Sequence, residues 1–182
     1  ARHVAEFSFT FRAFISYAHA DHDWAVWLHR ALERYRVPRR LAGAEGLRRL
    51  GKVFRDEEEL AAAAELGPKI DAALRASDVL IAVCSPRSAK SKWVNTEIEA
   101  FKLLGREHRV FALILDGTPH GTEDECFPEA LKRTVAEERS PVTSTWVIVT
   151  NPIRGSRSWV SRASAMICRT VSATWSGRRL FR

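Results

Sequence analysis

The sequence places one carboxylate beside a large aromatic side chain at the start of an expected helix. Trp93 and Glu97 are four residues apart, so on a helix they project from the same face. Val94, Ile98 and Phe101 recur at core spacing, so Glu97 borders a buried surface. The carboxylate is either a surface acid that offsets the helix dipole or a reactive group. With an aromatic wall and a cation, it suits glycosidic bond cleavage, because it would stabilise an oxocarbenium-like transition state.

Apolar runs on both sides of this helix predict the sheet that must position it. Residues 11–17 read as a short buried strand, and residues 78–84 and 109–115 are uniformly apolar, which is typical of strands buried on both faces. Residues 51–54 and 145–150 are weaker candidates. Strand and helix alternate, so the sequence predicts an α/β fold in three layers, with about five parallel strands and helices on both faces.

Helices are expected between these strands. Asp21 or Asp23 is expected to cap the first helix, and Pro38 to stop it. Pro68 is expected in the first turn of the next one. The helix that carries Glu97 is expected to follow a loop over residues 85–90 and to end near Gly105. The residues of the first helix expected to face the core are Trp24, Leu28, Ala31 and Tyr35, with Trp27 and Leu32 beside them.

Polar residues follow the expected strands at the edge where open parallel sheets bind ligands. Ser16 and Tyr17 end the first strand, and Arg55 and Asp56 follow the second. Arg can hold a phosphate, and an aromatic can stack on a base. Each also has a structural interpretation: strand-end packing for the first pair, a local salt bridge for the second. No Gly-rich phosphate loop is present, which argues against a kinase, a GTPase or a Rossmann oxidoreductase.

Charge argues against a nucleic-acid partner. The 182-residue chain carries 29 Lys and Arg against 22 Asp and Glu, a formal net charge of +7. Eight of those arginines, and no acid, lie in residues 139–182, which leaves 21 basic against 22 acidic side chains in residues 1–138. Binding to nucleic-acid phosphates needs clustered positive charge, so no nucleic-acid binding is expected from residues 1–138. Residues 139–182 are expected to be an atypical Arg-, Ser- and Trp-rich tail, with a last strand and an irregular segment.

The sequence shows no pattern of a membrane, secreted or metal-binding protein. No apolar run reaches the roughly 18 residues of a membrane span, and no secretion signal is visible at the N-terminus. Cys84, Cys126 and Cys168 are isolated, which fits a reducing compartment, so a cytoplasmic location is expected. Capping and solvation explain the His and Asp residues of positions 19–23, so no metal site is expected.

Three motifs, in order, resemble those of Toll/interleukin receptor (TIR) domains. FRAFISY at residues 11–17 resembles their first strand, and VFRDEEELAAAAEL at 53–66 their second strand and the long loop after it. SDVLIAVCSPRSAKSKWVNTEIEAF at 77–101 resembles their third strand and third helix, with the W-x-x-x-E spacing of enzymatic members. The resemblance covers roughly residues 8–135, and we assign residues 1–138 to the domain core.

The resemblance implies a flavodoxin-like sheet and cleavage of the nicotinamide–ribose bond of NAD. The products would be nicotinamide and ADP-ribose, or a cyclic ADP-ribose isomer. NAD is then a substrate, with no cofactor and no metal. Glu97 would be the catalytic residue, and Trp93 would be the aromatic side chain at the entrance of the substrate site. The other residues implied to line the nucleotide site are Ser16, Tyr17, Arg55 and Asp56.

The resemblance also implies partners. Self-association with other TIR domains would occur through a mobile loop and would activate the domain, in signalling or in immune and antiphage defence. The loop residues implied are Arg55, Asp56, Glu57, Glu58, Glu59, Leu60 and Leu66. The loop lacks the Pro-Gly pair of many receptor-type members. Two alternatives remain open: an adaptor module that binds other TIR domains without turnover, and a sensor that binds a nucleotide without cleaving it.

Overall fold

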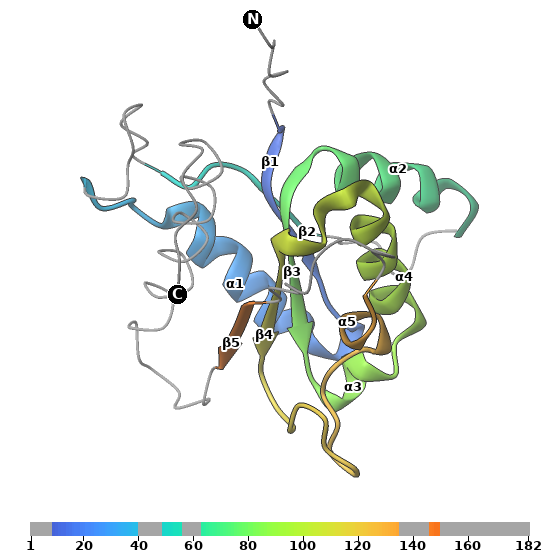
Figure 1. The fold of residues 1–182 in the computed structure, drawn as a ribbon. Coiled ribbons are helices and arrows are strands. Elements are labelled where there is room, and N and C mark those ends of the chain that lie inside the picture. The colour runs from blue at the N-terminus through green and yellow to red at the C-terminus, as the bar shows by residue number, and fades with distance from the viewer. Residues whose placement is uncertain (1–8, 40–48, 56–62, 135–145, 150–182) are drawn as a thin grey trace, which may run out of the picture.

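A parallel five-stranded sheet forms the centre of the computed structural model, which describes residues 9–39, 49–55, 63–134 and 146–149 (Figure 1). The strand order is β2-β1-β3-β4-β5, the flavodoxin-like order, and all pairs are parallel. The expected α/β fold is therefore confirmed. The strands are β1 (Phe11–Ser16), β2 (Val53–Arg55), β3 (Ser77–Cys84), β4 (Val110–Ile114) and β5 (Trp146–Val149).

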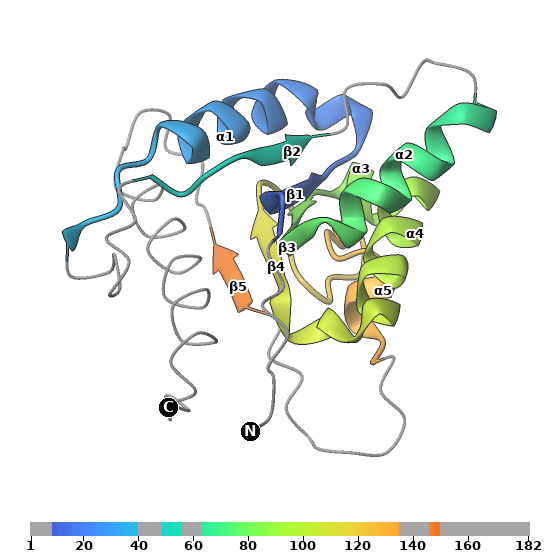
Figure 2. The same cartoon turned by 90° about the horizontal axis from the view of Figure 1, so that it is seen from above.

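Helices cover both faces of this sheet. Figure 2 shows α1 on one side and α2, α4 and α5 on the other. Each side has its own apolar core, as a doubly wound sheet requires. The helical segments are η1 (His19–Asp21), α1 (His22–Arg34), α2 (Ala63–Arg75), α3 (Pro86–Ala89), α4 (Lys92–Phe101), η3 (Lys102–Arg106), η4 (Glu107–Arg109) and α5 (Glu129–Lys132).

Strand alternation decides which polar residues reach which core. Ile15 in β1 packs on the α1 side and Phe14 on the α4 side, because successive strand side chains point to opposite faces. Ser16 shares the direction of Phe14 and therefore points toward α4. That helix docks through Val94, Ile98 and Phe101, which are all buried as the sequence predicted.

The core-facing stripe expected for α1 was partly wrong. Leu28 and Leu32 are buried as predicted, but the third buried position is Ala25. Trp24 and Trp27 are 38% and 39% exposed, and their rings meet edge-on with centroids 5.9 Å apart. Ala25 lies in the same buried cluster as Ala13 and Ile15 of β1, whereas the two indoles are partly exposed.

Three local expectations also need correction. Helix α1 ends at Arg34, before Pro38, because Tyr35 already has an extended backbone (ψ 125°). Helix α2 begins at Ala63 and contains Pro68, so Pro68 is not in the first turn; the preceding alanines have the highest helix propensity. The expected loop 85–90 contains α3, which begins with Pro86 behind a capping box.

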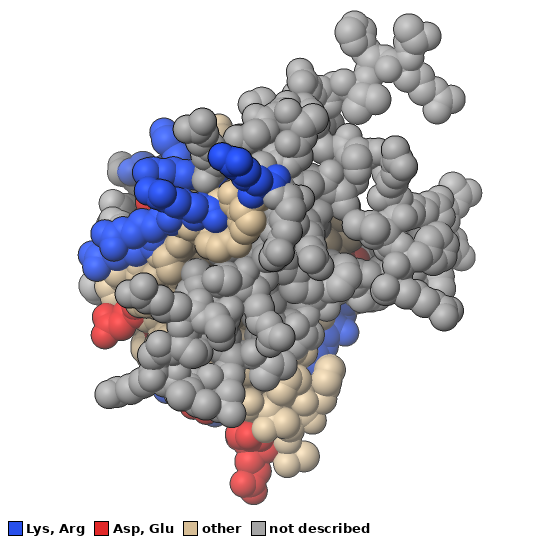
Figure 3. Space-filling view, turned by 90° about the vertical axis from the view of Figure 1, so that its left-hand side faces the viewer, with Lys and Arg blue, Asp and Glu red and all other residues tan. Residues whose placement is uncertain are grey.

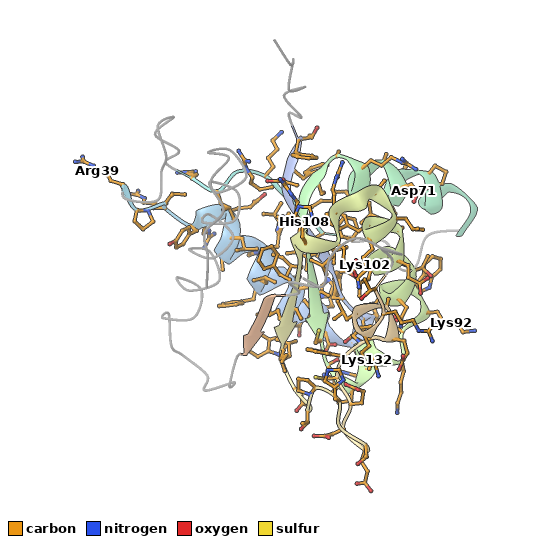
Figure 4. The ribbon with its side chains drawn as sticks, viewed as in Figure 1. Arg39, Asp71, Lys92, Lys102, His108 and Lys132 are labelled. Atoms are coloured by element: carbon orange, nitrogen blue, oxygen red, sulfur yellow. The ribbon has the colours of Figure 1, made fainter. Side chains whose placement is uncertain are left out.

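Helix α4 ends at Phe101 and continues into the turn η3, so the helical run ends near Gly105 as the sequence indicated. This glycine has φ 75°, a conformation that favours glycine, and it lies within the π-helical turn η3. The buried Lys102 lies in the same turn. Its Nζ donates to the Arg133 carbonyl at 2.6 Å and lies 2.9 Å from a carboxylate oxygen of Glu107. Figure 4 shows Lys92, at the other end of the helical run, on the outer side of the molecule.

Positive side chains gather on one side of the molecule despite the nearly neutral core sequence. Figure 3 shows a group of Lys and Arg side chains on the side that lies to the left in Figure 1, where α1 lies. The exposed cations in and after α1 are Arg30, Arg34, Arg36 and Arg39. A net charge of −1 over residues 1–138 did not predict this cluster, because it carries no information on where charges lie.

The loop after β4 packs closely against the start of α3. Gly117 has φ 84°, and a Cβ added there would clash with the backbone oxygen of Asp124. It would also lie 2.9 Å from Cys126 Cβ and 3.1 Å from Pro86 Cγ. A glycine is therefore required at this position both for its backbone conformation and for space.

Two Gly→Ala substitutions separate these effects. Gly105→Ala introduces backbone strain only, because nothing lies within 4 Å of its added Cβ, and we expect it to lower the free energy of unfolding by about 1 kcal/mol. Gly117→Ala adds a steric clash, and we expect a loss of roughly 3 kcal/mol. Urea denaturation measures both values. Equal losses would show that the close packing around Gly117 contributes nothing.

Candidate active site

A buried pair of side chains joins α4 to the end of β1. Glu97 is only 7% exposed, although it carries a carboxyl group. The Ser16 hydroxyl, also buried, donates to Glu97 Oε2 at 2.5 Å. The side chain of Ser91 caps α4 by accepting from the Val94 N–H, which fixes where the helix begins. Glu97 thus sits at the end of a central strand, held by a residue 81 positions away.

A second buried carboxylate lies in the connection after β1. Asp21 Oδ2 accepts a hydrogen bond from Ser85 Oγ at 2.5 Å. Its Oδ1 accepts from Arg87 Nε at 3.1 Å and from Arg87 Nη2 at 2.6 Å. The hydrogen bonds and charge of Asp21 raise the pKa of Arg87, which keeps the guanidinium charged. Asp21 was expected to cap α1, but its side chain makes no capping bond and instead ties η1 to α3.

A third contact joins the ends of β1 and β2. Arg55 Nη1 donates to the Tyr17 hydroxyl at 3.3 Å. Tyr17 packs against the core on the α1 side, whereas Ser16 and Glu97 meet on the α4 side. Four of the six predicted site residues therefore form two pairs, one on each face of the sheet at its carboxyl edge.

All three groups lie where an open α/β sheet is expected to bind a ligand. β1 and β3 are neighbours in the sheet. The chain runs from β1 to β2 at one edge of the sheet, and from β3 to β4 toward the other edge. Ligands of flavodoxin-like folds bind outside the carboxyl ends of these two strands. Figure 1 shows α3 just beyond the end of β3, and α3 contacts both η1 and α4.

The remaining predicted residues are placed only in part. Trp93 lies one turn before Glu97 and is 52% exposed, so it is available to a ligand and is not a core residue. Asp56 and the acidic loop to Leu60 lie outside the described residues, and so does the side chain of Leu66. Among the residues that can be described, no cluster of three His, Cys, Asp or Glu could hold a metal ion.

Sequence reasoning missed the roles of Ser85, Arg87 and Asp21 in this network. Ser85 was visible as a polar residue at a strand end, and Asp21 only as a potential cap. Asp21 and Arg87 are 66 positions apart, so no local pattern connects them. The sequence did indicate that the residues after the first and third strands lie at the same edge of the sheet. It did not indicate which of their side chains make contact.

Taken together, the fold and these residues define a doubly wound α/β domain with a candidate site where the strand order reverses. Over residues 13–137 the chain matches the family model described as "TIR domain". The chain belongs to the TIR-domain family, which confirms the resemblance carried by the three motifs.

The chain is also similar to a protein whose name states an activity. "NAD(+) hydrolase ApTIR" from Actinoplanes sp. is 36% identical to this chain over 106 residues. The match covers 58% of this chain but only 14% of that protein, so the chain spans a small part of its relative. In the parts of the chain that are described, no helix is long and apolar enough to cross a membrane.

Two cysteines belong to the apolar core on the α4 side of the sheet. Cys84 and Cys126 are fully buried and unoxidised. Burial raises the pKa of Cys84 well above its usual value and, with the charge of Glu125, raises the pKa of Cys126 to about 11. Both thiols are therefore protonated at neutral pH, and both side chains serve as small apolar packing groups.

Thiol labelling tests this description. In a Cys168→Ser variant, the folded protein is expected to react slowly with Ellman's reagent at pH 8, because a pKa near 11 leaves roughly one thiolate in a thousand. The rate is expected to rise about tenfold per pH unit while the fold persists. Unfolding in guanidinium should release two rapidly reacting thiols. Rapid labelling of both thiols in the folded protein would contradict the buried positions.

Proposed function

We propose that this TIR domain cleaves the bond between nicotinamide and ribose in NAD+. The observation that carries the proposal is the buried Glu97, held by Ser16 at the carboxyl edge of the sheet. This edge is where open α/β folds bind nucleotides, which supports the proposal. Similarity to a protein named as an NAD(+) hydrolase supports the same chemistry.

The reaction places positive charge where a carboxylate can meet it. As the N–C1′ bond breaks, its electron pair moves to the nicotinamide ring, which leaves as a neutral molecule. The ribose becomes oxocarbenium-like, and the negative charge of Glu97 stabilises it. Water then adds to C1′, loses a proton and gives ADP-ribose. If an adenine nitrogen adds instead, the product is a cyclic isomer of ADP-ribose.

Ser16 has a positioning role in this scheme. A carboxylate that pivots freely would stabilise charge less well than one fixed in place. The 2.5 Å hydrogen bond from Ser16 holds one oxygen of Glu97 and links it to the rigid end of β1. The exposed Trp93 ring, one turn away, is the proposed stacking surface for the substrate, and the Tyr17–Arg55 pair lines the neighbouring strand end.

Self-association belongs to the proposal as well. We infer that several copies must cluster for turnover, through the acidic segment that follows Arg55 in the sequence, and that the domain acts in signalling or defence. An adaptor that binds other TIR domains, or a sensor that binds NAD+ without cleaving it, is the competing function. Nicotinamide release separates the enzyme from both alternatives.

Substitution of Glu97 tests the activity and its site. Glu97→Gln keeps the shape but removes the charge, and we expect kcat to fall at least about 100-fold. Chromatography of NAD+ incubated with bead-clustered protein measures nicotinamide. Glu99→Gln, at an exposed position on the same helix, is the control and should retain activity. No nicotinamide from clustered wild-type protein would overturn the enzymatic proposal, whereas full activity of Glu97→Gln would overturn only the site.

Ser16→Ala tests the positioning role. Loss of a hydrogen bond to a charged group is expected to lower kcat by roughly 10- to 100-fold with a smaller change in KM. Ser91→Ala is the matched control, because it removes a helix cap and not a contact to Glu97. The same assay applies, with circular dichroism to verify folding. An unchanged kcat in folded Ser16→Ala would exclude Ser16 from catalysis.

A further inference from the structure

Arg87 is a cation that the fold holds in one orientation. Its Nε and Nη2 both donate to the buried Asp21, so one edge of the guanidinium is fixed. The side chain is nevertheless 53% exposed, and its hydrogen bonds to the described residues are made by Nε and Nη2, not by Nη1. An arginine oriented by a buried carboxylate, with donors still facing solvent, is suited to binding an anionic oxygen.

The supports of this arginine are themselves buried. Asp21 has no exposed side-chain surface and also accepts from Ser85. Ser85 caps α3 in a reciprocal arrangement with Ser88, so the turn that carries Arg87 is fixed at its first residue. Gly117 brings the β4 loop against Pro86 from the other side. Arg87 is therefore anchored more firmly than an ordinary surface arginine.

The position of Arg87 relates it to the proposed reaction centre. Ser16 pairs in register with Ala82, and both strands end at this edge, β1 toward η1 and β3 toward α3. Ser16 contacts Glu97, and Asp21, five residues after Ser16, contacts Arg87. The Glu97 carboxylate, proposed to act on the ribose, and the Arg87 guanidinium are thus both held at the carboxyl ends of β1 and β3.

We propose that Arg87, positioned by Asp21, binds the diphosphate of the substrate. This inference rests on the proposed function and extends it. NAD+ carries its diphosphate next to the ribose that is cleaved, so a substrate held with that ribose at Glu97 needs a phosphate ligand nearby. A cation at the carboxyl edge meets that need, and Arg87 was not among the site residues expected from the sequence, where Arg55 was the arginine considered for a phosphate.

The surrounding charges are compatible with this role. Besides Asp21, the acid that acts on Arg87 is Asp116, at the end of β4, and Asp116 is exposed. Solvent screens an exposed carboxylate, so it opposes a phosphate only weakly. Asp21 reduces the net charge of the site, but it also fixes the guanidinium, and preorganisation lowers the cost of binding.

The competing explanation is purely structural: Asp21 and Arg87 would only tie two loops together. Binding of ADP-ribose, measured by calorimetry, separates the two without depending on turnover. Arg87→Gln is expected to weaken ADP-ribose binding about tenfold or more, because a charge-assisted contact is lost. Lys90→Gln removes an exposed cation from the same turn and should change the affinity less than about twofold.

Kinetics provide the second readout. Arg87→Gln is expected to raise KM for NAD+ about tenfold with a smaller effect on kcat, and to have little effect on nicotinamide riboside, which lacks the diphosphate. Arg87→Lys keeps the charge but loses the two-nitrogen contact to Asp21, so an intermediate affinity is expected. If Arg87→Gln does not fold, Arg87→Lys carries the test.

The results distinguish this inference from the proposed function. Arg87-dependent binding of ADP-ribose without nicotinamide release would support the diphosphate site and overturn the enzyme. Nicotinamide release with unchanged ADP-ribose affinity in folded Arg87→Gln and Arg87→Lys would overturn the diphosphate site alone. Failure of the wild-type protein to bind ADP-ribose at millimolar concentration would also overturn it.

Discussion

Two carboxylates are buried at one edge of the sheet, and this constraint organises the site. A buried carboxylate is stable only when donors surround it, because its transfer from water is costly. Ser16 and Ser85, at or just past the ends of the two central strands, donate to Glu97 and Asp21 respectively. The pairing of β1 with β3 therefore determines the placement of both acids at once.

That dependence extends to the helices. Glu97 can reach Ser16 only if α4 lies flat on the sheet, and Val94, Ile98 and Phe101 provide that docking through buried apolar contacts. Asp21 can reach Ser85 only if η1 approaches the start of α3. The apolar cores thus fix the positions of the elements, and the polar contacts at their ends fix the orientations of side chains available for chemistry.

The sequence predicted the sheet because β3 and β4 are almost uniformly apolar, and it placed Glu97 next to a buried surface from a helical spacing that is a local property. It failed where the outcome depends on contacts between distant residues. Trp24 fits an apolar stripe as well as Ala25 does, and only the closeness of α1 to the sheet decides between them. Likewise, the partner of Asp21 is an arginine 66 positions later, whose sequence neighbourhood gives no sign of it.

The central position of β1 has a consequence for synthesis of the chain. β1 pairs with β3 over the register from Phe11 to Ser16, and its other neighbour, β2, has only three residues. At roughly 5–20 residues per second, the ribosome needs several seconds after β1 to deliver β3. During that interval the apolar β1 segment has no long partner within its own chain, so nascent chains must be shielded from one another until β3 emerges.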